Sequence, residues 1–296
     1  MTLFNTFLLS CGISGGIKRN FMGMVNDLAE SKEMNNFEFD GEKYKQASKH
    51  QKEWGNRLIS ELELNGNEII LDLGCGDGVL TEHLSTLVPN GKVIGIDASV
   101  SMIQSAKKCV KDNLVFICMD INDMDFSNDF DVIFSNAALH WVKNHEKLLK
   151  TTLTALKPNG IIRWNFAGDG NCSNFFDIVK SVMNENVYKE YFIHFEWPWY
   201  MPSKEEYEKL IAKAGFSNVH IAHENADRYF VDCDEMVRWI DQPSIVPFIK
   251  CLPDGQKENF RNAVIDRMIE RTKQPDGRCF ETFRRINVKA INLKKA

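Results

Sequence analysis

A short stretch around residue 72 combines a carboxylate with a series of glycines, and this combination can bind a small polar molecule. The apolar run from Ile69 to Leu71 predicts a buried strand, which Asp72 follows directly. The glycines after it are Gly74, Gly76 and Gly78. Because glycine has no Cβ, the backbone can turn sharply there and a ligand can lie against it. A helix beginning near Val79 would offer its free N–H groups to the polar part of the same ligand.

The spacing of these glycines differs from that of a dinucleotide-binding protein. The order here is Gly-x-Gly-x-Gly, whereas a dinucleotide fold uses Gly-x-Gly-x-x-Gly and binds a pyrophosphate. The carboxylate of Asp72 would repel a pyrophosphate and would suit a ligand that carries an ammonium group. The spacing therefore disfavours a nicotinamide-dependent oxidoreductase. An ordinary tight turn between a strand and a helix is the alternative that this stretch alone leaves open.

Polar residues also end or follow the next three apolar runs of the chain. These runs and their polar residues are Lys92 to Asp97, Leu114 to Met119 with Asp120, and Phe130 to Phe134 with Asn136. Asp97 comes about 20 residues after the glycine turn, where the ribose-binding acid of a strand–helix–strand unit stands. Because parallel strands place their carboxyl ends at one edge of a sheet, these side chains should meet at a ligand site. The alternatives are that Asp97 caps a helix, a role open to Ser99, and that Asp120 begins a loop.

Together these residues resemble the class I S-adenosylmethionine-dependent methyltransferases. Asp72-x-Gly-x-Gly-x-Gly is similar to their motif I, the loop that holds the methionine part of the cofactor. The resemblance implies that Asp97 accepts the ribose hydroxyls, that Asp120 bonds the adenine amino group and that Ile121 packs on the ring. The cofactor-binding residues that it implies are Asp72, Gly74, Gly76, Gly78, Asp97, Ala98, Met102, Asp120, Ile121 and Asn136. The cofactor would be S-adenosyl-L-methionine, and no metal is expected.

The resemblance and the order of apolar runs imply an α/β fold. We expect a Rossmann-like class I methyltransferase with a seven-stranded, mostly parallel sheet, helices on both faces and helical inserts after strands five and six. Residues 1–36 should form a disordered N-terminal extension. Residues 37–296 should form the methyltransferase domain, with helical lid inserts at about 168–202 and 231–276.

Two helices can be predicted next to the strands that they would cover. Trp54, Leu58 and Leu62 recur at helical spacing and should pack on the sheet. The stretch from Asn144 to Leu156 predicts a second helix, which should end at the Lys-Pro-Asn-Gly turn over residues 157–160. A fifth strand is expected after that turn, from residue 161 to residue 166.

The inserts are the part of the chain that a minimal methyltransferase would not need. The first is rich in Phe, Tyr and Trp, which suits either a lid that excludes water from a ligand or the core of a helical insert. After it, Ser203 and Glu206 form a Ser-x-x-Glu capping box for a helix that Gly215 should close. Near the chain end stand Arg278, Arg284 and Arg285. Such a cluster commonly solvates a surface, but beside an aromatic lid it would also suit a carboxylate substrate.

A finer resemblance concerns the acceptor of the methyl group. The run from Phe134 to Val142 and the later pattern of Trp239, Pro247 and Leu252 are similar to the trans-aconitate 2-methyltransferases. The juvenile hormone acid and malonyl-carrier-protein methyltransferases share parts of the pattern. All of these enzymes form methyl esters of carboxylic acids. The resemblance therefore implies a small carboxylic acid such as trans-aconitate as the substrate.

The resemblance places His140 and Trp141 toward the substrate, and we hypothesise that they position the acceptor together with Gln51. These three are the expected catalytic residues. A carboxylate is ionised at neutral pH, since its ordinary pKa is about 4, and it needs no general base. With a phenol, an amine or a carbon acid as acceptor, His140 would be the base.

Composition narrows the possible partners. The chain has 296 residues and a net charge of -5, so the clustered basic residues of a nucleic-acid-binding face are not expected. The eight cysteines form no Cys-x-x-Cys pair, which indicates thiols in a reducing cytoplasm and neither disulfides nor a metal site. No membrane association and no obligate protein partner are expected. The rival interpretations are transfer to an O, N or C acceptor of another small molecule, a non-catalytic S-adenosylmethionine-binding protein, and an RNA methyltransferase. An RNA enzyme would commonly carry Asn/Asp-Pro-Pro-Tyr/Phe where Asn136 begins Asn-Ala-Ala-Leu.

Overall fold

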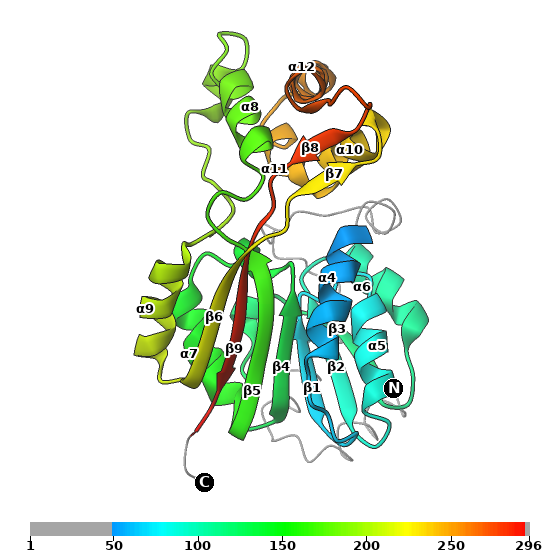
Figure 1. Cartoon of the computed structure of the whole chain (residues 1–296), viewed down its shortest axis with the longest axis vertical. Coiled ribbons are helices and arrows are strands. Elements are labelled where there is room, and N and C mark those ends of the chain that lie inside the picture. The colour runs from blue at the N-terminus through cyan, green and yellow to red at the C-terminus, as the bar shows by residue number, and fades with distance from the viewer. Residues whose placement is uncertain (1–48, 294–296) are drawn as a thin grey trace.

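A central sheet of seven strands organises the part of the chain that the computed structural model describes, residues 49–293 (Figure 1). The strand order is β3-β2-β1-β4-β5-β9-β6. The strands are β1 (Ile69–Leu73), β2 (Lys92–Asp97), β3 (Leu114–Cys118), β4 (Phe130–Asn136), β5 (Leu156–Ala167), β6 (Ser217–Asn225) and β9 (Arg284–Ile291). β9 runs antiparallel to both β5 and β6, and the other neighbouring pairs are parallel. The expected fold is confirmed. The predicted extension over residues 1–36 and the first part of the domain lie outside the described residues.

Helices cover both faces of this sheet. They are α4 (Lys49–Ser60), α5 (Val79–Leu87), α6 (Val100–Ala106), α7 (His145–Ala155) and α9 (Lys204–Ala214), with the short 3-10 turns η2 (Lys107–Cys109), η3 (Ile121–Asp123) and η4 (Leu139–Trp141). Leu58, Leu84 and Ile103 bring α4, α5 and α6 into one apolar core. Leu149 of α7 and Ile211 of α9 belong to a second core on the opposite face. Both cores form because the central strands are apolar on each side, as expected of a buried parallel sheet.

The capping residues fix where α7 and α9 begin. The side chain of Asn144 accepts a hydrogen bond from the backbone N–H of Lys147 at 2.9 Å. At α9 the predicted capping box is present, since Ser203 Oγ accepts from Glu206 N at 3.2 Å and Glu206 Oε2 accepts from Ser203 N at 2.9 Å. Gly215 closes α9 in the left-handed conformation, as predicted. These local signals set the helix ends because each satisfies backbone groups that the helix leaves open.

The two inserts form a separate layer beyond the carboxyl ends of the strands (Figure 1). The first contributes α8 (Ser173–Met183) and η5 (Lys189–Phe192). The second contributes β7 (Arg228–Phe230), α10 (Cys233–Trp239), η6 (Ile240–Ser244), α11 (Val246–Ile249), α12 (Asp254–Thr272) and β8 (Cys279–Glu281). Both inserts share one apolar core, which includes Phe175, Trp239, Phe248 and Phe260 and which we call the insert core. β7 and β8 pair as an antiparallel two-stranded sheet that the sequence did not predict.

Two local expectations were wrong. Trp54 was expected to pack on the sheet, but it belongs to the insert core and its ring lies 5.6 Å from that of Phe283. The fifth strand was expected only after the Lys-Pro-Asn-Gly turn, but β5 begins at Leu156. The Lys-Pro-Asn-Gly sequence forms an irregularity within β5, because the register with β4 shifts there and Asn159 adopts a φ of 63°. The backbone of Asn292 maintains pairing on the other side, since its O and N bond Asn159 and Gly160 at 2.7 and 2.9 Å.

Candidate active site

One cavity of about 1030 Å³ lies between the carboxyl ends of the strands and the insert core. The predicted site residues that line it are Gln51, Gly74, Gly76, Asp97, Ala98, Met102, Asp120, Ile121, Asn136, His140 and Trp141. These residues come from α4, α6, η3 and η4, from the last residues of β2 and β4, and from the loops after β1, β2 and β3. The structure thus brings residues from separate segments of the chain to one place. The two predicted residues that do not line the cavity are Asp72 and Gly78.

The glycine turn between β1 and α5 presents its backbone to this cavity. Gly74 and Cys75 each donate a backbone hydrogen bond to Ile96 O at 2.9 Å, which ties the turn to the end of β2. Gly74, Gly76 and Gly78 all have positive φ values, of 71°, 56° and 80°. A Cβ added at Gly76 would meet no heavy atom within 4 Å. Open space beside a backbone that glycine alone adopts easily is what a ligand lying against the turn requires.

Asp72 lies beneath the turn and not in the cavity. Its side chain is 2% exposed and accepts a hydrogen bond from Thr81 Oγ1 of α5 at 2.7 Å. The pKa of Asp72 is raised to about 7, mainly by burial; the hydrogen bond from Thr81 lowers this pKa, and the nearby charge of Asp97 raises it. Asp72 therefore stabilises the junction of β1 and α5, and any effect on a cofactor would act through the turn.

Asp97 is the last residue of β2. Its Oδ2 accepts from the backbone N–H of Gly76 at 3.0 Å, and its Oδ1 accepts from Ser99 N at 2.9 Å. Ser99 caps α6, since its hydroxyl accepts from Met102 N at 3.4 Å. The carboxylate is thus held at the rim of the glycine turn and is not used as the helix cap. A ribose would meet it at the cavity wall.

Asp120 combines the two roles considered for it. Its Oδ1 accepts from the backbone and side-chain nitrogens of Asn122 at 2.8 and 2.9 Å and so begins η3. Asp120 and Ile121 also line the cavity. Ile121 is partly buried, packs against the apolar core and supplies an apolar side chain next to Asp120 in sequence. This pairing of a polar edge with an apolar face suits a flat heterocycle such as adenine.

Asn136 and Gln51 bring polar atoms to the end of β4. Asn136 Nδ2 donates to the backbone oxygen of Gln51 at 2.8 Å, which connects β4 to α4. Asn136 Oδ1 and Gln51 Oε1 are buried, and neither atom has a hydrogen-bond partner within the described part of the chain. A buried acceptor left in this state is costly unless a ligand supplies a donor. The ammonium group of a bound methionine portion is a donor of the required kind.

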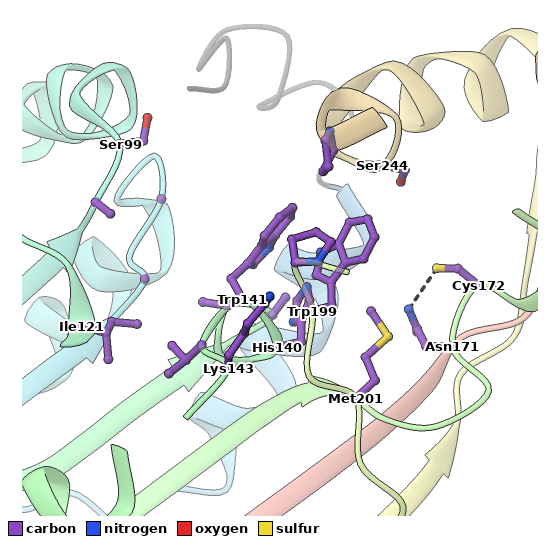
Figure 2. Close-up of a pocket in the computed structure, with 18 of the residues that line it drawn as sticks. Ser99, Ile121, His140, Trp141, Lys143, Asn171, Cys172, Trp199, Met201 and Ser244 are labelled. Atoms are coloured by element: carbon purple, nitrogen blue, oxygen red, sulfur yellow. Dashed lines mark hydrogen bonds between the residues drawn. The ribbon is translucent and has the colours of Figure 1, made fainter. Parts of the chain in front are cut away.

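His140 and Trp141 form the next part of the wall, where Figure 2 shows their rings beside that of Trp199. The Trp141 and Trp199 centroids lie 5.1 Å apart. His140 Nδ1 is buried and has no hydrogen-bond partner among the described residues. Burial holds the pKa of His140 well below its ordinary value, and the positive charge of Arg285 lowers it further. The imidazole is therefore neutral at physiological pH and offers hydrogen bonding, not charge, to a ligand.

The far wall contains residues that the sequence reasoning did not assign to the site. They are Asn171, Cys172, Phe176, Trp199, Phe283 and Arg285, joined by Trp54. The aromatic content of the first insert was the signal for Phe176 and Trp199. Arg285 was noticed only as one of three arginines. The structure separates them, because Arg278 pairs with Asp276 at 2.7 Å and Arg284 pairs with Asp227, both at the surface.

The fold and the cavity define a Rossmann-like methyltransferase, and residues 64–222 match the family described as Methyltransferase domain. The match covers more than half of the chain, which therefore belongs to this family. The cofactor of the chain is S-adenosylmethionine, and the cavity fits it: the open turn at Gly76, Asp97 and Asn136 all line one space, and the buried Asn136 oxygen has no hydrogen-bond partner within residues 49–293. The chain is an enzyme of the S-adenosylmethionine-dependent methyltransferase class.

Individual relatives agree on the class and differ in substrate. An uncharacterised methyltransferase of Schizosaccharomyces pombe is 29% identical over 77% of this chain and 88% of its own. The trans-aconitate 2-methyltransferase of an Acidovorax species is 27% identical over 75% of this chain and 85% of its own. Among solved structures, phosphoethanolamine N-methyltransferase 2 of Haemonchus contortus in complex with S-adenosyl-L-methionine has a TM-score of 0.55 and 17% identity, covering 96% of this chain and 61% of that one. That last likeness concerns the fold.

No group of three or more His, Cys, Asp or Glu side chains within residues 49–293 is placed to hold a metal ion. No helix in that same range has the length and apolar character needed to cross a membrane.

Proposed function

We propose that this methyltransferase forms a methyl ester on a small carboxylic acid, of the kind represented by trans-aconitate. The observation that carries the proposal is the neutral, buried His140 in a largely aromatic cavity wall next to the glycine turn. A histidine with such a low pKa is a weak general base at neutral pH. A carboxylate acceptor needs no base, so this wall suits an acid better than a phenol or an amine. The similarity to trans-aconitate 2-methyltransferases over three quarters of the chain supports the same substrate class.

In this proposal the protein positions two reactants and excludes water. When bound, S-adenosylmethionine supplies an electrophilic methyl group on a sulfonium sulfur. The acceptor oxygen would take this methyl group while the electrons of the carbon–sulfur bond stay on sulfur, so that the products would be a methyl ester and S-adenosylhomocysteine. His140, Trp141 and Gln51 would hold the acceptor oxygen in line with the methyl group. Such alignment can supply on the order of 7–11 kcal/mol at best.

The site residues that would bind the cofactor are those at the strand ends. Gly74 and Gly76 would pass the methionine portion along the backbone, Asp97 would accept the ribose hydroxyls, and Asn136 would accept from the ammonium group. Asp120 and Ile121 would bind the adenine, with Ala98 and Met102 on the same wall. Asp72 and Gly78 would support the turn from beneath, since the cavity does not reach them.

The test is a methyl-transfer assay with radiolabelled S-adenosylmethionine and a panel of mono-, di- and tricarboxylic acids. Release of the label by mild base identifies a methyl ester and ranks the acids as substrates. A base-stable product would contradict the proposal and indicate an O, N or C acceptor of another kind. Cofactor binding without transfer to any acid would also contradict it and would favour a non-catalytic binding protein.

His140→Ala separates positioning from base catalysis. We expect turnover of the best acid to stay within about fivefold of the wild-type rate, because general-base catalysis would contribute about 10²–10⁴-fold. The KM for the acid should rise, since the imidazole no longer fills the wall. A matched control is His194→Ala, which removes another histidine that lines the cavity, from the first insert. If turnover drops by about two orders of magnitude or more in His140→Ala alone, the imidazole acts as a base and a carboxylate acceptor is contradicted.

A further inference from the structure

Two cysteines of the second insert place their sulfur atoms next to each other. Cys233 is the first residue of α10, and Cys279 is the first residue of β8. Their Sγ atoms lie 3.4 Å apart, and both are free thiols. A disulfide bond joins two sulfurs at about 2.0 Å, so these two would need to approach each other by only about 1.4 Å. A small movement therefore separates the pair from a covalent bond.

The two cysteines differ in how accessible and how firmly held they are. Cys279 is fully buried in the insert core, and β8 fixes its backbone by antiparallel pairing with Phe230 of β7. Cys233 is only partly buried, and it directly follows the exposed residues Val231 and Asp232. A small molecule can approach Cys233 from solvent, and the exposed start of α10 can supply the movement that a bond requires.

The protonation of Cys279 sets the order in which the two sulfurs would react. The pKa of Cys279 is raised to about 11, mainly by burial and also by the neighbouring Cys233, while Thr272 and Lys273 act to lower it. At neutral pH its sulfur is therefore a thiol, whereas the nucleophile in thiol–disulfide exchange is the thiolate. Cys233, the more accessible of the two, should react first, and Cys279 should complete the bond.

We propose that Cys233 and Cys279 form a redox modification site, at which a low-molecular-weight disulfide such as oxidised glutathione converts the pair into a reversible disulfide bond. The Cys233 thiolate attacks one sulfur of the oxidant and releases one glutathione. The Cys279 sulfur then loses its proton, attacks the Cys233 sulfur in the mixed disulfide and releases the second glutathione. The pair loses two electrons and two protons, and the small disulfide becomes two thiols. An excess of the small thiol reverses the reaction by the same exchange.

The bond would join two elements that bring aromatic side chains to the cavity. Trp239 ends α10 and Phe283 follows β8, both residues line the cavity, and their ring centroids lie 5.7 Å apart. Cys233 and Cys279 are 46 positions apart in sequence, so the bond would close a loop that contains η6, α11 and α12. Because a closed loop restricts the unfolded chain, the oxidised protein should be more stable than the reduced protein.

The experiment treats the full chain with oxidised glutathione at neutral pH, blocks the remaining thiols with iodoacetamide and maps the cysteines by mass spectrometry of proteolytic fragments. The wild type should yield a cross-linked fragment that joins Cys233 to Cys279 and has lost two hydrogens. Dithiothreitol should restore both thiols. The melting temperature of the oxidised wild type should exceed that of Cys233→Ser, treated in the same way, by about 5 °C or more.

The two single variants should respond to the oxidant in different ways. In Cys279→Ser, Cys233 should keep one glutathione as a mixed disulfide, because the thiol that displaces it is missing. In Cys233→Ser, Cys279 should stay reduced, because it is buried and protonated. The affinity for S-adenosylhomocysteine, measured by calorimetry, checks that both variants fold.

Two results in the wild type alone would overturn the proposal. One is glutathione that stays on Cys233, which would mean that Cys279 cannot reach it. The other is a free thiol at both positions after treatment. A cross-linked wild type that melts no higher than the treated Cys233→Ser would overturn the expected stabilisation, because it would mean that the bond strains the folded insert.

Discussion

Gly74 and Gly76 differ in what an added methyl group would meet, so the same substitution should affect them in different ways. At Gly74 a Cβ would come within 2.2 Å of Ala138 Cβ, whereas at Gly76 it would meet nothing within 4 Å. We expect Gly74→Ala to lower the free energy of unfolding by at least about 2 kcal/mol, from overpacking and the positive φ. We expect Gly76→Ala to cost about 1 kcal/mol of stability and to weaken S-adenosylmethionine binding about tenfold, because its methyl group projects toward the cofactor.

Gly277 supplies a matched control for the loss of stability that an alanine causes at a positive φ. It has a φ of 88°, and an added Cβ there would also meet nothing within 4 Å, but it lies in the turn before β8 and not at the cavity. Gly277→Ala should therefore lose about the same stability as Gly76→Ala while keeping wild-type cofactor affinity. Urea unfolding and calorimetry measure the two quantities separately. Equal cofactor affinity in Gly76→Ala and Gly277→Ala would remove the turn from the binding site.

Asp72 should make the stability of the protein depend on pH between about 4 and 7. Its pKa is raised from 3.8 to about 7 in the folded protein, so the folded state holds the proton more tightly than the unfolded chain. The resulting stabilisation is complete below the unfolded pKa and is lost as the pH rises toward the folded pKa. The largest loss is about 4 kcal/mol, at about 1.4 kcal/mol per pH unit. Above about pH 7 the contribution should no longer change.

Asp72→Asn tests this linkage because an amide can still accept from Thr81 but does not titrate. The difference in unfolding free energy, variant minus wild type, should increase by a few kcal/mol between about pH 5 and pH 8. Urea titrations of the cofactor-free protein at these two pH values measure it, and the difference cancels the titration of the other groups. Thr81→Val should remove the bond without removing the titration, so its pH dependence should stay like that of wild type or grow steeper. A difference that is flat with pH would mean that Asp72 stays ionised in the fold.

At the scale of elements, signals confined to a few residues predicted the structure well. The capping box of Ser203 and Glu206 and the glycine at 215 are complete within one helix, and each satisfies backbone groups that have no other partner. The apolar runs of β1 to β4 are equally local, because a parallel strand buried on both faces must be apolar throughout. Such elements need no information from distant parts of the chain.

Elements that depend on distant partners were not predictable in the same way. β7 and β8 have three residues each and pair across a long intervening segment, so neither shows a period of its own. Trp54 shows the same limit for a side chain. Its helical spacing places it on the apolar face of α4, but only the fold brings Phe283 and Arg285 to that end of the helix.

The residues of the candidate site also differ in whether local sequence patterns could predict them. Sequence patterns could predict which strand-end residues line the cavity, because each of them ends or closely follows a recognisable apolar strand. Three arginines close together in sequence did not reveal which one reaches the cavity. Arg285 is distinguished from Arg284 only by strand alternation, which sends neighbours in β9 to opposite faces, and by Asn165 on the adjacent strand. The acceptor side therefore needed the structure.

On the scale of the whole molecule, the cavity lies where two differently built layers meet. The sheet with its helices forms two apolar cores, and the inserts form a third (Figure 1). The residues that we propose to bind the cofactor come from the sheet layer, whereas Trp199, Phe176 and Trp239 come from the inserts. This arrangement allows the acceptor wall to change without disturbing the cofactor wall. Relatives in one family with different named substrates are consistent with such a division.

Trp199 tests that division, with Trp197 as a control of the same residue type two positions away. Trp199 lines the cavity, and its ring centroid lies 5.1 Å from that of Trp141. Trp197 packs against the ring of Trp199 but does not line the cavity. We expect Trp199→Ala to lower kcat/KM for the acceptor about tenfold or more, because water enters the space that the ring filled. Trp197→Ala should lose a similar amount of stability, since both rings pack on Phe248, but should keep kcat/KM within about threefold of wild type. Neither change should alter the affinity for S-adenosylhomocysteine by more than about twofold, because the cofactor contacts that we propose lie at the strand ends. Steady-state kinetics and calorimetry on the two variants measure these quantities. Equal losses of kcat/KM in both variants would mean that the insert acts only through stability. A parallel loss of cofactor affinity would mean that the cofactor wall and the acceptor wall form one site.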